Sequence, residues 1–182
     1  LCPSKTVGGC DVRGSSPGSR ELALLASEKT MQEVHAVLLT GGSAFGLAAA
    51  DGVMKYLEEQ NIGYQTPWAK VPIVPSAVIF DLNIGSKSVR PTAESGYGAC
   101  QSARPDAVPE GNVGAGTGAT VGKLAGIGTR MKGGFGLASV TDNGLIVAAA
   151  AVVNAVGDVI DEKGNIVAGA RGSNGKWLAE ED

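Results

Sequence analysis

The sequence predicts a mixed α/β (α+β) fold with a large antiparallel share. Residues 34–40 (VHAVLLT) form an apolar strand pattern that leads into the turn 41–43 and then into a helical pattern at 44–60. Strand, glycine turn and helix in this order are the unit of α/β architecture. Farther along, Asn143 and Gly144 separate two apolar segments, which is a strong signal of a β-hairpin. The 28 glycines and 8 prolines among 182 residues indicate many tight turns.

The other elements follow from periodicity and turn residues in chain order. Apolar side chains at helical spacing predict a helix over residues 21–30, and residues 91–103 predict another with a proline near its start. Two prolines interrupt the apolar residues 71–80, so pairing as a strand is expected only at 77–80. Antiparallel strands are predicted at 136–141, 145–154, 156–160 and 166–170.

Composition excludes several classes of function. Charged residues make up only 18% of the chain and the net charge is −3, which argues against nucleic acid or an anionic membrane surface as partner. The longest apolar run, residues 145–153, is far shorter than the ~20 residues of a membrane-spanning helix. Three scattered cysteines and a single histidine, His35, fit neither a disulfide framework nor a zinc site, so we expect no metal, no cofactor and a reduced, cytoplasmic setting. His35 itself is expected to be a structural residue at the start of a strand.

The chain shows no internal repeat and no clear linker, so we predict one domain over residues 1–182. Both ends differ from those of a complete gene product. The chain begins with Leu1 rather than methionine, as though a strand were already under way, and residues 176–182 form a polar tail. We therefore expect a piece of a longer protein.

A glycine-rich segment, residues 111–118 (GNVGAGTG), is predicted to form a loop followed by a short helical turn through Lys123. Residues 114–119 fit the dinucleotide pattern G-x-G-x-x-G/A, but that pattern must follow a buried strand, and the residues before the loop are polar. A Walker A loop is excluded because Thr117 and Leu124 stand where glycine and Ser/Thr are required. Nucleotide binding is not expected.

Ser43 stands between the predicted strand and helix, where a hydrolase nucleophile could lie. The spacing G-x-S-x-G fails because Phe45 occupies the final glycine position. With one histidine and no evident partner acid, Ser43 is better interpreted as a helix N-cap.

Two polar residues stand out beside apolar or glycine-rich segments. Asn154 closes the apolar strand 145–153, and it is either a structural amide whose hydrogen bonds are satisfied or an oxyanion donor. Lys123 follows the glycine loop and is either a solvated surface lysine or a site residue. The residues alone leave both alternatives open.

Segments along nearly the whole chain resemble the DmpA-type aminopeptidases, a family of self-processing hydrolases. This family includes L-aminopeptidase/D-amidase/esterases, β-peptidyl aminopeptidases and nylon-oligomer (aminohexanoate-oligomer) hydrolases. The matching segments are residues 11–21 (DVRGSSPGSRE), 35–51 (HAVLLTGGSAFGLAAAD), 72–82 (PIVPSAVIFDL), 111–123 (GNVGAGTGATVGK), 153–161 (VNAVGDVID) and 166–171 (IVAGAR). Each segment alone is a weak signal, whereas their combination and order are specific.

The resemblance implies how the chain originates and folds. Precursors of this family cut themselves once into an N-terminal α chain and a C-terminal β chain, and the new N-terminal Ser or Thr of the β chain is the nucleophile. This sequence looks like the α chain, without its first strand or so and ending near the cleavage point. The implied architecture is a four-layer α/β/β/α sandwich completed by the second chain, in oligomers of αβ pairs.

The resemblance also assigns two site residues. Asn154 matches the asparagine whose side-chain amide helps to form the oxyanion hole, and Lys123 matches the active-site lysine of the nylon-oligomer branch. An N-terminal nucleophile needs no histidine, because its own α-amine can accept the hydroxyl proton. Gly114, Gly116 and Gly118 are expected either to pass close to the site or to form a tight structural turn.

The resemblance therefore implies an amide or peptide hydrolase acting on small peptides or amides with a free N-terminus. One alternative is an acyl transferase of the same fold, like the ornithine acetyltransferases. Another, from a different class, is a non-catalytic small-molecule-binding domain. A gene that continues into a Thr- or Ser-led apolar strand would favour the hydrolase.

Overall fold

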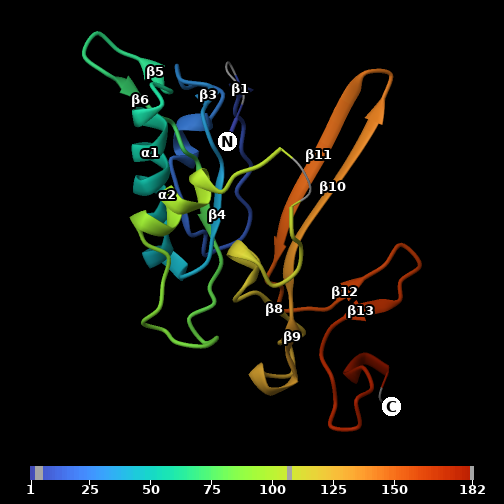
Figure 1. The fold of residues 1–182 in the computed structure, drawn as a ribbon. Coiled ribbons are helices and arrows are strands. Elements are labelled where there is room, and N and C mark those ends of the chain that lie inside the picture. Colours follow the sequence, from blue (N-terminus) through green and yellow to red (C-terminus); the bar gives the residue numbers. More distant parts are fainter. Residues whose placement is uncertain (3–5, 106–107, 181–182) are drawn as a thin grey trace. The chain divides into compact units, whose positions relative to one another are not determined.

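A computed structural model describes residues 1–2, 6–105 and 108–180 (Figure 1). The chain forms two compact units, and each is described by itself. The N-terminal unit comprises Leu1–Phe80 and Ser86–Asp106, and the C-terminal unit comprises Asp81–Gly85 and Ala107–Asp182. Helices and several small sheets confirm the mixed α+β class.

The central sheet of the N-terminal unit has three strands in the order β2-β7-β4. β7 (Ser76–Val78) pairs antiparallel with β2 (Ser19–Arg20) and parallel with β4 (Leu38–Thr40). In this parallel pair, β4 is the strand of the predicted strand–turn–helix unit, and the turn and the helix follow it in the sequence. Two short antiparallel pairs complete the unit: β1 (Thr6–Val7) with β3 (Glu33–Val34), and β5 (Tyr64–Gln65) with β6 (Lys70–Val71).

Two helices pack beside each other in this unit (Figure 1). The helical pattern at 44–60 begins as a 3₁₀ helix, η2 (Ser43–Ala48), and continues as α1 (Ala49–Glu59). α2 (Ala93–Gln101) lies within the predicted range 91–103, and Thr92 and Ser95 close its first turn as a capping box. The core between helices and sheet contains Ala36, Val53, Leu57, Val74 and Cys100.

The close approach of α1 and α2 requires glycine at position 96. A Cβ on Gly96 would lie 1.9 Å from the carbonyl oxygen of Ala49, whereas a Cβ on Gly98, in the same helix, would meet nothing within 4 Å. Gly96→Ala should therefore lower the free energy of unfolding by about 1–3 kcal/mol through overpacking. Gly98→Ala is the matched control and should raise it by up to about 1 kcal/mol through helix propensity. Thermal unfolding of the full-length protein measures both, and equal melting temperatures of the two variants would contradict the packing argument.

Two predictions for the N-terminal unit are wrong in part. The helix predicted over 21–30 is only one 3₁₀ turn, η1 (Leu22–Leu25). Glu21 adopts a left-handed backbone (φ 59°), and its carboxylate accepts a hydrogen bond from the N–H of Val74 (3.0 Å), so a tertiary contact replaces the first helical turn. The buried strand predicted at 34–40 is divided into β3 and β4, and the outward residues Val37 and Leu39 are exposed, which is the pattern of a half-buried strand.

The C-terminal unit consists of three antiparallel pairs and short 3₁₀ turns. Its strands are β8 (Thr120–Val121) with β9 (Met131–Lys132), β10 (Gly134–Asp142) with β11 (Leu145–Val153), and β12 (Val159–Ile160) with β13 (Ile166–Ala168). The 3₁₀ turns are η3 (Gly114–Gly116), η4 (Ile127–Thr129) and η5 (Leu178–Glu180). The predicted hairpins are thus confirmed, with shorter strands in the second.

The β10–β11 hairpin extends away from the shorter pairs of the same unit (Figure 1). Asn143 and Gly144 turn it with φ values of 47° and 83°, as a two-residue hairpin loop requires. Leu145 and Ile146 are 66% and 69% exposed, and most of both strands is exposed as well. The partly buried residues of the hairpin, 134–136 and 152–153, lie at its base, and both strands contact η3 of the same unit.

Residues 3–5, 106–107 and 181–182 lie outside the described part. The expected strand at the start of the chain, residues 1–3, and the polar tail at residues 176–182 fall partly on them. Within the described residues, no helix is long and apolar enough to cross a membrane.

Candidate active site

Lys123 follows β8 and the turn at Gly122. The predicted helical turn through Lys123 is wrong, because the chain forms β8 and then a sharp turn at Gly122 (φ 68°). A Cβ on Gly122 would lie 2.1 Å from the backbone nitrogen of Ala170, so only glycine fits here. The N–H groups of Gly122 and Lys123 donate to the carbonyls of Gly157 (2.9 Å) and Val156 (2.6 Å). These bonds fix the start of the lysine side chain beside the segment that follows β11.

Asn154 follows β11 directly, and the structure brings it into contact with Lys123. The ammonium Nζ of Lys123 donates to the side-chain oxygen Oδ1 of Asn154 at 2.8 Å. It also lies 3.4 Å from the backbone oxygen of Asn154. The two residues singled out in the sequence, 31 positions apart, therefore form one cluster in the C-terminal unit.

Thr120 is the third member of the cluster, and no motif in the sequence indicates it. Its side chain is buried (3% exposed), its N–H donates to Oδ1 of Asn154 at 3.1 Å, and its hydroxyl lies 3.4 Å from the same oxygen. Its carbonyl and hydroxyl oxygens accept from Nζ of Lys123 at 2.9 and 3.2 Å. A threonine within an apolar and glycine-rich segment carries no distinctive pattern, so only the tertiary contact reveals it.

These contacts determine which way the amide of Asn154 faces. A backbone N–H and an ammonium group are both donors only, so the atom that contacts them must be the amide oxygen. The amide nitrogen therefore occupies the opposite side of the side chain. In this orientation the NH₂ group is directed away from Lys123 and Thr120.

The ammonium of Lys123 is held by oxygen atoms of Thr120 and Asn154, all of them uncharged. Partial burial lowers the pKa of Lys123 below its ordinary value, and the positive charge of Arg130 lowers it further. A cation on the amide oxygen draws electron density from the NH₂ group, which makes its protons better hydrogen-bond donors. Such an amide is suited to stabilise negative charge that develops on an oxygen atom.

Of the three glycines of the predicted loop, Gly116 and Gly118 are tightly packed in this unit, and Gly114 has a left-handed backbone. A Cβ on Gly116 would lie 2.4 Å from the backbone nitrogen of Phe135, and one on Gly118 would lie 2.0 Å from Asp81 Oδ2. Gly114 has a positive φ of 51°. These contacts fit the interpretation of the loop as a structural turn that positions β8.

Ser43 and His35 do not form a catalytic pair in the described contacts. The nitrogen Nδ1 of His35 accepts a hydrogen bond from the N–H of Ile73 at 3.1 Å, which supports a structural role, although His35 lies between β3 and β4 rather than at the start of a strand. The prediction of Ser43 as N-cap is wrong, because Gly42 occupies that position and Ser43 is the first residue of η2. The N–H of Ser43 donates to the carbonyl of Ile79 at 3.0 Å, and this bond directs the turn after β4.

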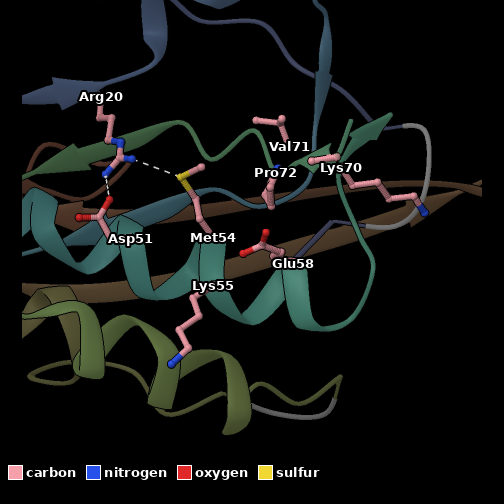
Figure 2. Close-up of a pocket in the computed structure, with 9 residues that line it drawn as sticks. Arg20, Asp51, Met54, Lys55, Glu58, Lys70, Val71 and Pro72 are labelled. Carbon is pink, nitrogen blue, oxygen red and sulfur yellow. Dashed lines mark hydrogen bonds and ion pairs between the residues drawn. The ribbon is translucent and has the colours of Figure 1, made fainter. Parts of the chain in front are cut away.

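A shallow cavity of about 370 Å³ lies in the N-terminal unit, between β2, α1 and β6 (Figure 2). Figure 2 shows the guanidinium of Arg20 against Asp51 (2.6 Å) and the sulfur of Met54 (3.2 Å). Arg20 is thus already engaged, and neither Lys123 nor Asn154 lines this cavity. Among the described residues, no group of three or more His, Cys, Asp or Glu side chains could hold a metal ion.

Comparison with known proteins gives a consistent set of relatives. The model of peptidase family S58 matches residues 1–174. An uncharacterized aminopeptidase of Mycobacterium leprae is 53% identical over 165 residues, which cover 88% of this chain and 45% of the relative. An uncharacterized aminopeptidase of Mycobacterium tuberculosis is 51% identical, with the same coverage. A 6-aminohexanoate-oligomer endohydrolase of Kocuria is 37% identical over 74% of this chain and 38% of the relative. The chain thus spans less than half the length of these relatives.

Proposed function

Because this chain belongs to peptidase family S58, we propose that it is the part of an amide and peptide hydrolase that stabilises the oxyanion of the reaction. The observation that carries the proposal is the contact of Lys123 and Thr120 with the amide oxygen of Asn154. In the proposed reaction, the NH₂ group on the opposite side of the Asn154 side chain donates to the oxygen of the reacting carbonyl. Asn154 is the proposed oxyanion donor, and Lys123 holds and polarises it.

The proposed nucleophile is a Ser or Thr at the N-terminus of a second chain, released from the same precursor by self-cleavage. Its α-amine accepts the hydroxyl proton as the oxygen attacks the amide carbon, and it returns that proton to the leaving amine. An unperturbed α-amine titrates near ~7.7–8.0, which suits a general base at neutral pH. The positive charge of Lys123 favours the neutral amine and also stabilises the negative oxygen of the tetrahedral intermediate.

The β10–β11 hairpin is the proposed contact surface for that second chain. Leu145 and Ile146 are apolar and exposed, and β11 is apolar on both faces, as strands covered on both sides are. The chain spans 45% of the length of its mycobacterial relatives, so their remaining part is long enough to cover the hairpin. We propose that this cover completes a four-layer α/β/β/α sandwich, which places the nucleophile near Asn154.

The proposed substrates are small peptides or amides with a free N-terminus, and the proposed assembly is an oligomer of αβ pairs. The names of the relatives, aminopeptidase and 6-aminohexanoate-oligomer endohydrolase, both describe cleavage of amide bonds. The three scattered cysteines of the sequence accord with the cytoplasm as the proposed location.

Intact-mass spectrometry with N-terminal sequencing of the purified full-length product tests the proposal. We expect two fragments, one that contains this chain and one that begins with Thr or Ser. Replacing that first residue with alanine should abolish both the cleavage and the hydrolysis of a dipeptide substrate. A single uncut chain with undiminished hydrolysis would contradict the proposed nucleophile, and an uncut chain without hydrolysis would favour a binding protein.

A further inference from the structure

Arg130 stands beside the Lys123–Asn154 cluster and is held there by the backbone on both sides. It lies between η4 and β9, and Met131, the next residue, is opposite Val121 of β8. The side chain of the preceding Thr129 donates to the carbonyl of Gly122 at 3.0 Å. Arg130 is therefore placed opposite the turn from which the side chain of Lys123 starts.

One nitrogen of the partly buried Arg130 guanidinium lacks a hydrogen-bond acceptor among the described residues. Its Nη1 atom is buried and has no hydrogen-bond partner among the described residues. No described carboxylate forms an ion pair with it either. Buried donors in folded proteins are almost always paired, and an unpaired charged donor is strongly destabilising. The simplest physical account of the unpaired Nη1 is an acceptor outside the residues that the structure describes.

The neighbouring charge of Lys123 favours an anionic acceptor over a neutral one. Lys123 is also a cation, its contacts are all to uncharged oxygen atoms, and the charge of Arg130 acts on it. Two cations close together in a partly buried place are mutually repulsive unless an anion accompanies them. The planar fork of a guanidinium fits the two oxygens of a carboxylate.

We propose that Arg130 binds a carboxylate beside the Lys123–Asn154 cluster. One source of this group is the substrate, since a peptide ends in a carboxylate. The other source is an Asp or Glu side chain of the protein outside the described residues. The substrate source rests on the proposed amide hydrolase function, whereas a carboxylate from the protein does not.

Arg130→Met in the full-length protein separates these sources, because methionine keeps most of the apolar stem and removes the charge. Arg104→Met is the control, since Arg104 is exposed in the loop after α2. If the protein supplies the carboxylate, Arg130→Met lowers the melting temperature by several degrees, and Arg130→Lys restores part of the loss. If Arg130 has no anion in the free protein, its removal leaves the melting temperature unchanged or raises it.

The substrate source is tested with a dipeptide and the same dipeptide as its C-terminal amide. Arg130→Met should then raise KM for the free carboxylate form about tenfold to a hundredfold and leave KM of the amide form unchanged. As a probe independent of hydrolysis, sodium acetate should raise the melting temperature of the wild type above that in sodium chloride of equal ionic strength. Arg130→Met should lose that response.

The proposal is overturned if Arg130→Met does not lower the melting temperature and also leaves both the acetate response and the KM difference as in the wild type. Failure of the proposed function has a different signature, because the wild type then hydrolyses neither dipeptide. In that case the melting temperatures and the acetate response still decide whether Arg130 binds a carboxylate.

Discussion

Replacing Asn154 with alanine should lower kcat of the processed hydrolase by about 10²–10³-fold, the usual cost of losing one oxyanion donor. The amide NH₂, held in place by the contacts of Lys123 (2.8 Å) and Thr120 (3.1 Å) on the amide oxygen, is the group that is lost. The variant should also be less stable by about 1–3 kcal/mol, because those two donors lose their acceptor. Steady-state kinetics of the processed protein, with the processed fraction taken from the intact mass, measures the effect.

Asn154→Asp separates catalysis from stability in this experiment. Aspartate retains an oxygen for Lys123 and Thr120 but cannot donate from the other arm of its carboxylate. We expect its melting temperature to stay near that of the wild type while kcat falls as far as in the alanine variant. Asn174→Ala is the control, because Asn174 is exposed in a turn and accepts a bond only from the N–H of Lys176. A processed Asn154→Asp enzyme with kcat close to wild type would exclude Asn154 as the donor.

Replacing Lys123 with methionine should lower kcat by about 10–100-fold, which corresponds to losing a hydrogen bond from a charged donor. Without the ammonium, the amide of Asn154 is neither polarised nor held by its shortest contact (2.8 Å). KM should change much less than kcat, because the proposed charge acts mainly on the oxyanion. Lys163→Met is the control, since Lys163 is exposed in the turn between β12 and β13. Equal kcat values for Lys123→Met and Lys163→Met would refute the role of Lys123.

The pH dependence gives an independent check of the same residue. Burial and, after it, the charge of Arg130 lower the pKa of Lys123, so its ammonium loses its proton at a lower pH than an exposed lysine does. The protonated form is the proposed active form, so kcat should decline as pH rises through this lowered pKa. In Lys123→Met the remaining activity should lack that alkaline decline. If kcat of Lys123→Met still declines at high pH as in the wild type, the decline belongs to another titrating group.

The elements with strong local signals could be predicted from the sequence. Asn143–Gly144 between apolar segments specified the β10–β11 hairpin, and Pro91 indicated the start of α2. The segment 21–30 could not be predicted, because the carboxylate of Glu21 bonds to Val74, 53 residues away, and this distant contact replaces a local helix. Local propensity is weak compared with such contacts.

The candidate site shows the same division. Asn154 and Lys123 were identified from motifs in the sequence, and their proposed roles come from the family resemblance. Thr120 and Arg130 were missed, since a threonine in a glycine-rich segment and an arginine in a loop match no catalytic pattern. They become candidates because the side chain of Thr120 and the Nη1 atom of Arg130 are buried near the other two residues. Such burial depends on which segments the fold brings together.

By itself, the sequence determined the mixed α+β class, the hairpins and the family, because turn residues, apolar spacing and motifs are local properties of the chain. Tertiary structure alone decided that Lys123 contacts Asn154, that the amide oxygen faces the ammonium, and that β11 is exposed. The physical reason is that hydrogen-bond geometry and burial depend on segments that meet only after folding. Lys123 and Asn154 are 31 positions apart in the sequence, and the pairing of β8 with β9 and of β10 with β11 brings them together.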